Sequence, residues 1–327
     1  MIPHSKPYIG EEETEAVSRV LRSGLLAQGT EVLAFEEECA AFIGRRYGVA
    51  VNSGTAALHL GLVTLGIGKN DAVIMPSYAC AALVHPVLWQ RAQPVLCDVT
   101  EHYGLDAQAV PARCRAVVVP HLFGAPVPFK PGNHVIEDIA QSIGGSTGKG
   151  TPICVASFYA TKMLTTGEGG MLLTDDPAIA EEARDRRDYD NRDSFAVRYA
   201  YKMTDFQAAL GRVQLQRLPG FVTRRREIAD QYTAAFQGLP LRLPMGREHV
   251  YFRYVVATPR RQELTEYLDE EGVAAKRPVY RPLHHYLGGA FPNAERAHLE
   301  CLSLPIYPAM TAKEVQGVIQ SVLKFFG

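Results

Sequence analysis

The sequence predicts an α/β protein with a largely parallel sheet. Three observations predict this class: short apolar segments recur along the chain, helical patterns lie between some of them, and 327 residues are enough for two domains. The apolar segments predict buried strands at residues 72–75, 94–97, 116–119, 134–137, 153–158 and 170–173. Strands that alternate with helices favour parallel pairing.

Helical periodicity justifies the elements between and before these strands. Residues 55–65 carry Leu58, Leu62 and Leu65 on one helical face, and Gly66 is typical of a helix end. Residues 13–21 and 32–41 also predict helices, and the charged segment 181–187 predicts a helix with a solvated face.

A long helical pattern over residues 203–232 is expected to be interrupted near Pro219 and Gly220. We place the domain boundary there, which gives a large domain of residues 1–218, including the N-terminal helical segment, and a small domain of residues 219–327. Within the small domain, the sequence predicts a strand at 251–257 and helices at 261–271 and 312–325. We therefore expect a small α/β domain.

Composition excludes several classes of protein. Lys and Arg number 34 against 35 Asp and Glu, for a net charge of −1, which argues against nucleic acid or a charged membrane surface as partner. No apolar run approaches the ~20 residues of a membrane helix, and the N-terminus lacks the pattern of a secretory signal. Six scattered cysteines without a Cys-x-x-Cys pair indicate reduced thiols and no structural zinc. We therefore expect a cytoplasmic enzyme or small-molecule binder without a metal.

Three segments carry residues suited to chemistry. In residues 52–58, Gly54 and Thr55 open a helix whose free N–H groups can hold a phosphate, although a simple helix cap explains the same residues. Asp138 ends an apolar strand, where its carboxylate can keep a ring nitrogen protonated or cap the next helix. Lys162 follows another strand, where it can serve as a Schiff-base amine or lie on a surface loop. Phosphate site, carboxylate and lysine together are what pyridoxal phosphate requires.

At these residues the chain resembles the DegT/DnrJ/EryC1/StrS family of sugar aminotransferases, which are fold-type I pyridoxal phosphate enzymes. The resemblance covers nearly the whole chain, and its ordered series of motifs is specific although each motif alone is weak. The motifs lie at residues 2–3, 6–7, 23–24, 29, 35–36, 52–58, 120–124, 137–142, 157–162, 167–170, 207–211 and 302–308.

The resemblance implies a fold and a set of roles. It implies a large domain with a mostly parallel mixed sheet, a small C-terminal α/β domain, and a homodimer with active sites at the subunit interface. Lys162 would form the Schiff base and move the proton, and Asp138 would pair with the ring nitrogen. The cofactor contacts would come from Gly54, Thr55, Cys80, Asp138, Gln141, Ser157 and Lys162. The reaction implied is amino transfer, typically from glutamate, to a keto sugar nucleotide.

Two positions depart from the family pattern. Cys80 stands where an aromatic ring usually stacks on the cofactor, and Tyr78, which shares a strand face with it, is a candidate substitute. Ala200 stands where the family has an Asn that reaches the cofactor phosphate of the neighbouring subunit, and Lys202 stands where the family has Arg. Ala200 cannot make that contact, and Lys202 keeps the positive charge but loses the bidentate fork of Arg. These departures leave open a non-catalytic or regulatory homologue, or a pyridoxal phosphate enzyme with a different keto substrate.

His284 matches a Pro-Leu-His segment that the family has near the mouth of its active site. We predict that His284 binds substrate, with a purely structural histidine as the alternative.

Overall fold

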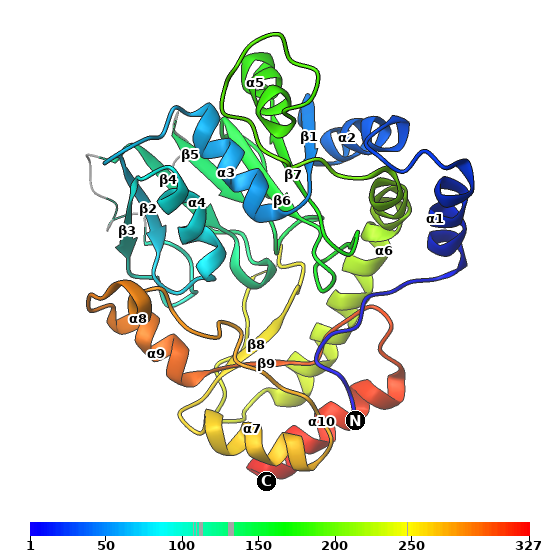
Figure 1. Cartoon of the computed structure of the whole chain (residues 1–327). Helices are drawn as coiled ribbons and strands as arrows, with labels where there is room; N and C mark the ends of the chain where they lie inside the picture. The colour runs from blue at the N-terminus through cyan, green and yellow to red at the C-terminus, as the bar shows by residue number, and fades with distance from the viewer. Residues whose placement is uncertain (107, 109, 111–113, 130–133, 247) are drawn as a thin grey trace.

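The computed structural model describes residues 1–106, 108, 110, 114–129, 134–246 and 248–327. A seven-stranded sheet with the order β1-β7-β6-β5-β4-β2-β3 forms the centre of its upper part (Figure 1). All strand pairs are parallel except those of β7, which runs antiparallel to both β1 and β6. The strands are β1 (Tyr47–Val51), β2 (Ala72–Pro76), β3 (Gln93–Cys97), β4 (Ala116–Pro120), β5 (Val135–Asp138), β6 (Ile153–Ser157) and β7 (Gly170–Thr174).

The predicted α/β class with a mostly parallel mixed sheet is confirmed. All six predicted strands form, within a residue or so of their expected ends. Strand β1 was not predicted, because its apolar core of three residues, Val49 to Val51, is shorter than the segments that signalled the other strands.

Helices cover both faces of the sheet, which is the usual arrangement for buried parallel strands. One face packs on α3 (Gly54–Thr64), α4 (Val84–Trp89) and α5 (Pro177–Arg187). The other face packs on α2 (Thr30–Ile43) and on the first half of α6 (Asp205–Phe236), and α1 (Glu11–Ser23) lies against α6. Short 3-10 turns occupy Ala81–Leu83 and Leu122–Gly124. The carboxyl ends of the parallel strands face the lower part of the molecule (Figure 1).

The lower part has its own core around a two-stranded antiparallel sheet. Strands β8 (Tyr254–Ala257) and β9 (Cys301–Leu304) pair there, with α7 (Arg261–Glu270), α8 (His284–Leu287), α9 (Pro292–Glu300) and α10 (Ala312–Phe326) around them. β8 begins later than predicted because Tyr251 has φ +51°, a left-handed conformation that ends the extended backbone. β9 was not predicted from sequence.

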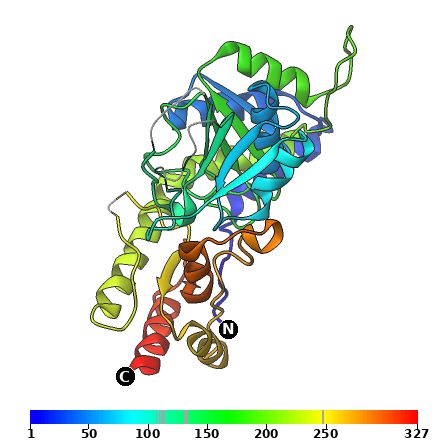
Figure 2. The same ribbon diagram turned by 90° about the vertical axis from the view of Figure 1, so that its left-hand side faces the viewer.

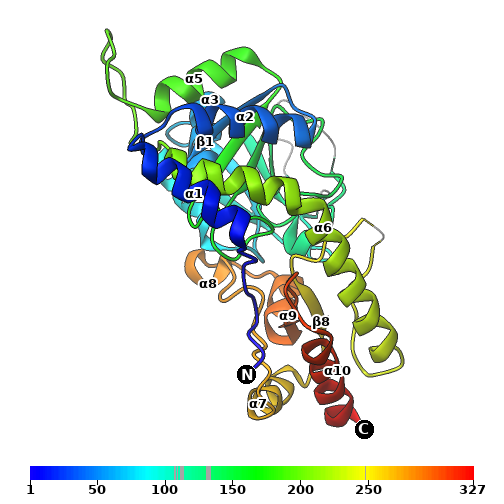
Figure 3. The ribbon, with the colours of Figure 1, turned by 90° about the vertical axis from the view of Figure 1, so that its right-hand side faces the viewer.

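The N-terminal segment lies along this lower part (Figures 1 and 3). The Ile2 N–H donates to the carbonyl of Gly272 at 2.7 Å, and the Ala274 N–H donates to the carbonyl of Ile2 at 3.0 Å. The first residues are therefore part of the small domain's periphery, and the chain enters the large domain at α1.

Helix α6 is continuous across Pro219, so the predicted interruption near Pro219 and Gly220 is wrong. A proline within a helix costs about 3 kcal/mol, but apolar residues on both sides of it hold the helix in place. Leu215, Leu218 and Val222 are buried against the large sheet, and the end of the helix enters the core of the lower part. The division at residues 218 and 219 stays a prediction.

Between α5 and α6 the chain extends far from the sheet (Figure 2). Its side chains include Phe195, which is completely exposed, and the exposed Tyr189 and Val197. No helix among the described residues is both long enough and apolar enough to cross a membrane.

Candidate active site

A cavity of about 880 Å³ opens at the carboxyl ends of β5 and β6, beside the first turn of α3. The sequence placed seven candidate cofactor contacts far apart along the chain, and all of them line this one cavity. They are Gly54, Thr55, Cys80, Asp138, Gln141, Ser157 and Lys162. The position agrees with the rule that ligands of open α/β sheets lie at the carboxyl ends of the strands.

Lys162 lies half-buried in the wall of the cavity. Its backbone N–H donates to the carbonyl of Tyr159 at 2.9 Å, and its Nζ lies 5.3 Å from the centre of the Phe252 ring. Burial lowers the pKa of the Lys162 amine below its usual 10.5, while the charge of Asp138 partly opposes this effect. The amine is thus more available as a nucleophile than that of a surface lysine.

Asp138 ends strand β5, and its Oδ1 accepts a hydrogen bond from the Ala140 N–H at 2.9 Å. Burial raises the pKa of this carboxyl, and the Ala140 hydrogen bond and Lys162 pull it back down. Asp138 therefore lines the cavity with a carboxyl group that the Ala140 N–H holds in place.

The first turn of α3 forms another wall. Ser53 caps the helix by accepting from the Ala56 N–H at 3.1 Å, which leaves the N–H groups of Gly54 and Thr55 without helical acceptors. A Cβ on Gly54 would lie 2.7 Å from the Ser157 Cβ, so only glycine lets Ser157 approach this turn. Backbone N–H groups and two hydroxyl groups lie together at this turn. Such a group of donors is typical of anion-binding sites at helix N-termini.

Gln141 and His121 complete the inner wall. The Phe123 N–H donates to the Gln141 Oε1 at 2.7 Å, which holds that amide in place. His121 lines the same cavity and is almost completely buried, with its Nε2 2.8 Å from the Glu137 Oε1. Sequence reasoning did not place His121 in the site; its position directly after strand β4 was the available signal. Tyr159 and Glu168 also line the cavity without having been predicted.

Cys80 lines the cavity, whereas Tyr78 does not, so the substitution of Tyr78 for the missing aromatic ring is wrong. Residues 77–79 form a bend rather than a regular strand, and Tyr78 is fully buried on the other side of it. The Tyr78 hydroxyl donates to the carbonyl of Ala297 at 3.3 Å, and the ring packs near Tyr103 and Phe123.

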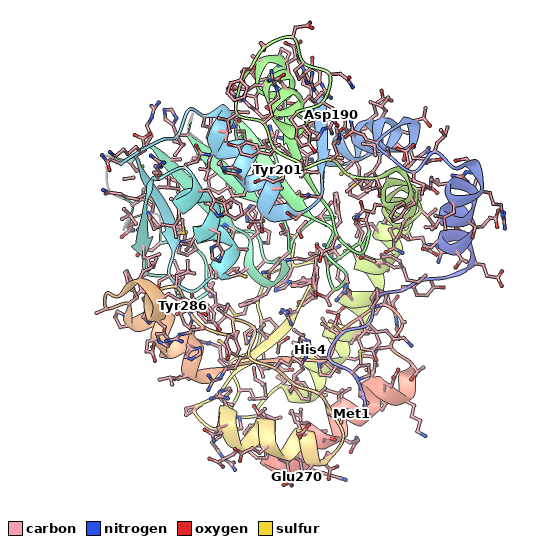
Figure 4. All side chains as sticks on the ribbon, viewed as in Figure 1. Met1, His4, Asp190, Tyr201, Glu270 and Tyr286 are labelled. Carbon is pink, nitrogen blue, oxygen red and sulfur yellow. The ribbon has the colours of Figure 1, made fainter. Side chains whose placement is uncertain are left out.

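Ala200 and Lys202 lie outside the cavity. Lys202 Nζ is 2.8 Å from both the Asp188 Oδ1 and the Asp190 Oδ2, and these two ion pairs raise the pKa of the Lys202 amine. Figure 4 shows Asp190 at the far end of the upper part, well away from the lower part. Lys202 is thus fully engaged within this chain.

His284 is not among the residues that line the cavity. Its Nδ1 lies 2.6 Å from the Ser77 Oγ and its Nε2 lies 3.0 Å from the Glu295 Oε2. The His285 Nε2 reaches the same Glu295 oxygen at 2.6 Å. These contacts tie α8 and α9 to the end of β2, three residues before Cys80, and a role of His284 in substrate binding stays a prediction.

Comparison with known proteins gives a consistent result. A sequence description of the DegT/DnrJ/EryC1/StrS aminotransferase family matches residues 7–323. The spore coat polysaccharide biosynthesis protein SpsC of Bacillus subtilis (strain 168) is 35% identical, over 98% of this chain and 96% of SpsC. The dTDP-3-amino-3,4,6-trideoxy-alpha-D-glucose transaminase of Streptomyces venezuelae is 34% identical, over 95% of this chain and 91% of that protein. The crystal structure of the aminotransferase TlmJ from Streptoalloteichus hindustanus superimposes with a TM-score of 0.91 at 32% identity, over 98% of both chains.

Proposed function

The chain belongs to the DegT/DnrJ/EryC1/StrS aminotransferase family, which depends on pyridoxal phosphate; from this we propose that it transfers an amino group from glutamate to a keto sugar nucleotide. The observation that carries the proposal is that Lys162, Asp138 and the first turn of α3 line one cavity. These are the amine, the carboxylate and the phosphate-binding turn that the cofactor needs.

The residues present fit this cofactor. The cavity offers a half-buried amine whose pKa is lowered by burial, and a carboxylate held by the Ala140 N–H. Gly54 leaves the space that a Cβ would fill beside Ser157, so that the backbone N–H groups of α3 stay open to an anion. When bound, pyridoxal phosphate would supply an aldehyde and an electron-withdrawing ring.

Each side chain then has one task. Lys162 would bind the aldehyde through its Nζ and afterwards move a proton to and from the substrate carbon. Asp138 would hold a proton on the ring nitrogen, and Gln141 would lie beside the ring hydroxyl. Gly54, Thr55 and Ser157 would bind the phosphate, and Cys80 would contact the ring with less area than an aromatic side chain offers.

The names of two relatives support a sugar nucleotide as acceptor. SpsC is named for polysaccharide biosynthesis, and the Streptomyces venezuelae relative is named as a transaminase for a dTDP-linked amino sugar. Glutamate as donor rests on the family resemblance. A cytoplasmic location is likewise our proposal, supported by six cysteines that are scattered along the sequence without a Cys-x-x-Cys pair.

We also propose a homodimer. The segment between α5 and α6 exposes Tyr189, Phe195 and Val197 on an excursion that makes few contacts with its own sheet (Figures 2 and 3). Apolar side chains on such a projection are typical of a surface that a second subunit covers. Light scattering on the purified protein tests this, and a monomer at micromolar concentration would contradict it.

The function is tested by absorption spectroscopy. The protein is expected to bind pyridoxal phosphate with a visible band, and glutamate is expected to remove that band. Lys162→Ala should lose both the absorption band and turnover. The control is Lys149→Ala, which replaces an exposed lysine and should lose neither.

Three other outcomes would redirect the proposal. An absorption band that no amino acid changes would favour a non-catalytic or regulatory homologue. A band that glutamate removes, but that only non-sugar ketones restore, would favour a different keto substrate. Wild-type turnover by Lys162→Ala would refute the assignment of the amine.

A further inference from the structure

A second cavity, of about 860 Å³, is lined in part by Phe252, whose ring also lies near the Lys162 amine. The N-terminal segment, β8 and β9 surround it, and Figure 4 shows His4 at this junction. Its polar lining is His4, Ser5, Thr161, Arg253, Lys276 and Ser303, and it contains no carboxylate. The remaining lining residues are apolar apart from their backbone.

The two strong cations of this cavity have no acidic partner. Among the residues that the structure describes, neither Arg253 nor Lys276 forms an ion pair. The Arg253 guanidinium contacts the His4 ring, with Nη1 3.1 Å from Nε2, and it lies over the Phe252 ring. Arg253 is half-buried, whereas most arginines of this chain lie beside a carboxylate or a carbonyl oxygen. The other N–H groups of this guanidinium have no acceptor among the described residues, so they are available to bind an anion in the cavity.

The surroundings add to the positive charge. Arg225 is buried near Arg253. Its guanidinium donates to the carbonyl oxygens of Tyr251, Phe252 and Ile306. Burial and the charge of Arg253 lower the pKa of Arg225 to about 9. Burial, Arg253 and Lys276 lower the pKa of His4 to about 3, so His4 is neutral near pH 7. The fold thus holds Arg225, Arg253 and Lys276 close together, and no described acidic residue forms an ion pair with any of them.

The second cavity adjoins the site of the proposed reaction. Thr161, the residue before Lys162, lines it. The Arg253 Cζ lies 5.0 Å from the centre of the Phe252 ring, and the Lys162 Nζ lies 5.3 Å from the same centre. Arg253 and the Lys162 amine therefore lie near the same ring, which brings an anion bound by Arg253 close to the amine of the proposed reaction.

We propose that Arg253 and Lys276 bind an oxyanion of a substrate in this cavity. The chemistry that fits is a carboxylate or a phosphate, because a guanidinium offers paired N–H donors to two oxygens and an ammonium adds a point charge. The hydroxyls of Thr161 and Ser303 and the neutral ring of His4 add uncharged contacts. If the proposed function holds, this oxyanion comes from one of two molecules: it is the carboxylate of the amino donor or the diphosphate of the sugar nucleotide.

Binding measured without turnover tests the site first. Glutarate, a dicarboxylate without an amine, and dTDP are titrated separately into the holoenzyme, and the shift of the unfolding temperature is recorded. We expect at least one of them to stabilise the wild type, and Arg253→Gln and Lys276→Gln each to need about tenfold more of it or greater. Arg260→Gln is the matched control, because Arg260 is exposed and already paired with Glu263 at 2.9 Å.

The half-reactions then distinguish the two sources. If Arg253→Gln raises the glutamate concentration that half-removes the cofactor band, the oxyanion is the donor carboxylate. If it raises only the KM of the sugar nucleotide, the oxyanion is the diphosphate. Unchanged binding of both probes and unchanged half-reactions in Arg253→Gln and Lys276→Gln would overturn the site.

Failure of the proposed function gives a different result. A wild type whose cofactor band ignores every amino acid would refute amino transfer, yet a probe that binds the wild type and not the Arg253 variant would still support the anion site. Lys276 is exposed, so we expect Lys276→Gln to fold. This variant therefore tests the anion site even if Arg253→Gln does not fold.

Discussion

His121 donates its Nε2 hydrogen to Glu137 at 2.8 Å, and both side chains are buried beneath the cavity that holds Asp138. The tautomer follows from the other ring nitrogen, because Nδ1 accepts from the Val127 N–H at 2.9 Å. Glu137 also accepts from the Gly148 N–H at 2.6 Å, so one buried carboxylate joins the ends of β4 and β5 to the following loop.

Replacing His121 by Asn should destabilise the protein. The Asn Oδ1 can still accept from Val127, but Glu137 loses a buried donor, which costs about 1–3 kcal/mol. Urea unfolding of the apoprotein measures the loss, with the exposed His102→Asn as control. Equal stability of the two variants would show that the His121–Glu137 contact contributes nothing.

Asp138→Asn should keep the fold and slow the reaction. The Asn Oδ1 can retain the hydrogen bond from Ala140, whereas the negative charge beside the ring nitrogen is lost. We expect kcat to fall by about 10²–10⁴-fold, with the cofactor still bound through Lys162. Single-turnover kinetics with glutamate measures this fall, and a kcat within twofold of the wild type would remove Asp138 from the mechanism.

The lowered pKa of Lys162 should appear in the pH dependence of cofactor uptake. The amine reacts only when deprotonated, so the rate should rise with pH and level off below pH 10.5, the usual pKa of lysine. Because the charge of Asp138 raises the pKa of Lys162, Asp138→Asn should move the plateau to still lower pH. Stopped-flow absorbance of the apoprotein with pyridoxal phosphate gives both profiles, and a plateau at or above pH 10.5 would contradict the burial of the amine.

Gly54→Ala should weaken cofactor binding. Its Cβ would lie 2.7 Å from that of Ser157, so the helix turn and Ser157 must move apart and the phosphate loses contacts. We expect the Kd of pyridoxal phosphate to rise by about tenfold or more, as loss of one charge-assisted hydrogen bond implies. Gly68→Ala, with open space around its Cβ, is the control. If both variants bind alike, the close approach of Gly54 to Ser157 has no role in binding.

His249 should make the protein less stable in acid. Burial lowers its folded pKa from 6.5 to about 3, so the unfolded chain binds a proton that the folded chain excludes between these values. Stability is therefore lost as the pH falls below 6.5, by about 3 kcal/mol at pH 4 for this group. His249→Asn, which can still accept from the Tyr251 N–H, should flatten the pH dependence of urea unfolding, whereas the exposed His85→Asn should not.

The sequence predicted the strands because apolar segments are local signals. The rule for strand ends also places Asp138 at the crevice without knowledge of the packing, whereas Cys80, Gln141 and Ser157 entered the candidate site only through the family resemblance, and their contacts with a cofactor stay a prediction. Tyr78 and Cys80 show the limit of this reasoning. Their spacing places them on one face only if the strand continues, and the bend at residues 77–79 is decided by tertiary contacts of Tyr78 with Ala297.

Arg253 and Pro219 show the same limit. In the sequence Arg253 is one charged residue within an apolar strand, and only the fold reveals that it faces His4 and Lys276 with no acid nearby. Pro219 reads as a helix break, but packing at Leu215, Leu218 and Val222 outweighs its local cost.

The continuous helix α6 limits how the two domains can move relative to each other. Its 32 residues form one rod of about 48 Å, which enters both cores. A rotation of the lower core against the large sheet about an axis across α6 would bend this rod, and Pro219 is where bending breaks the fewest hydrogen bonds, since it has no N–H to donate. Substrate-driven closure would therefore be a pivot about one proline, with an amplitude that Pro219→Ala should reduce.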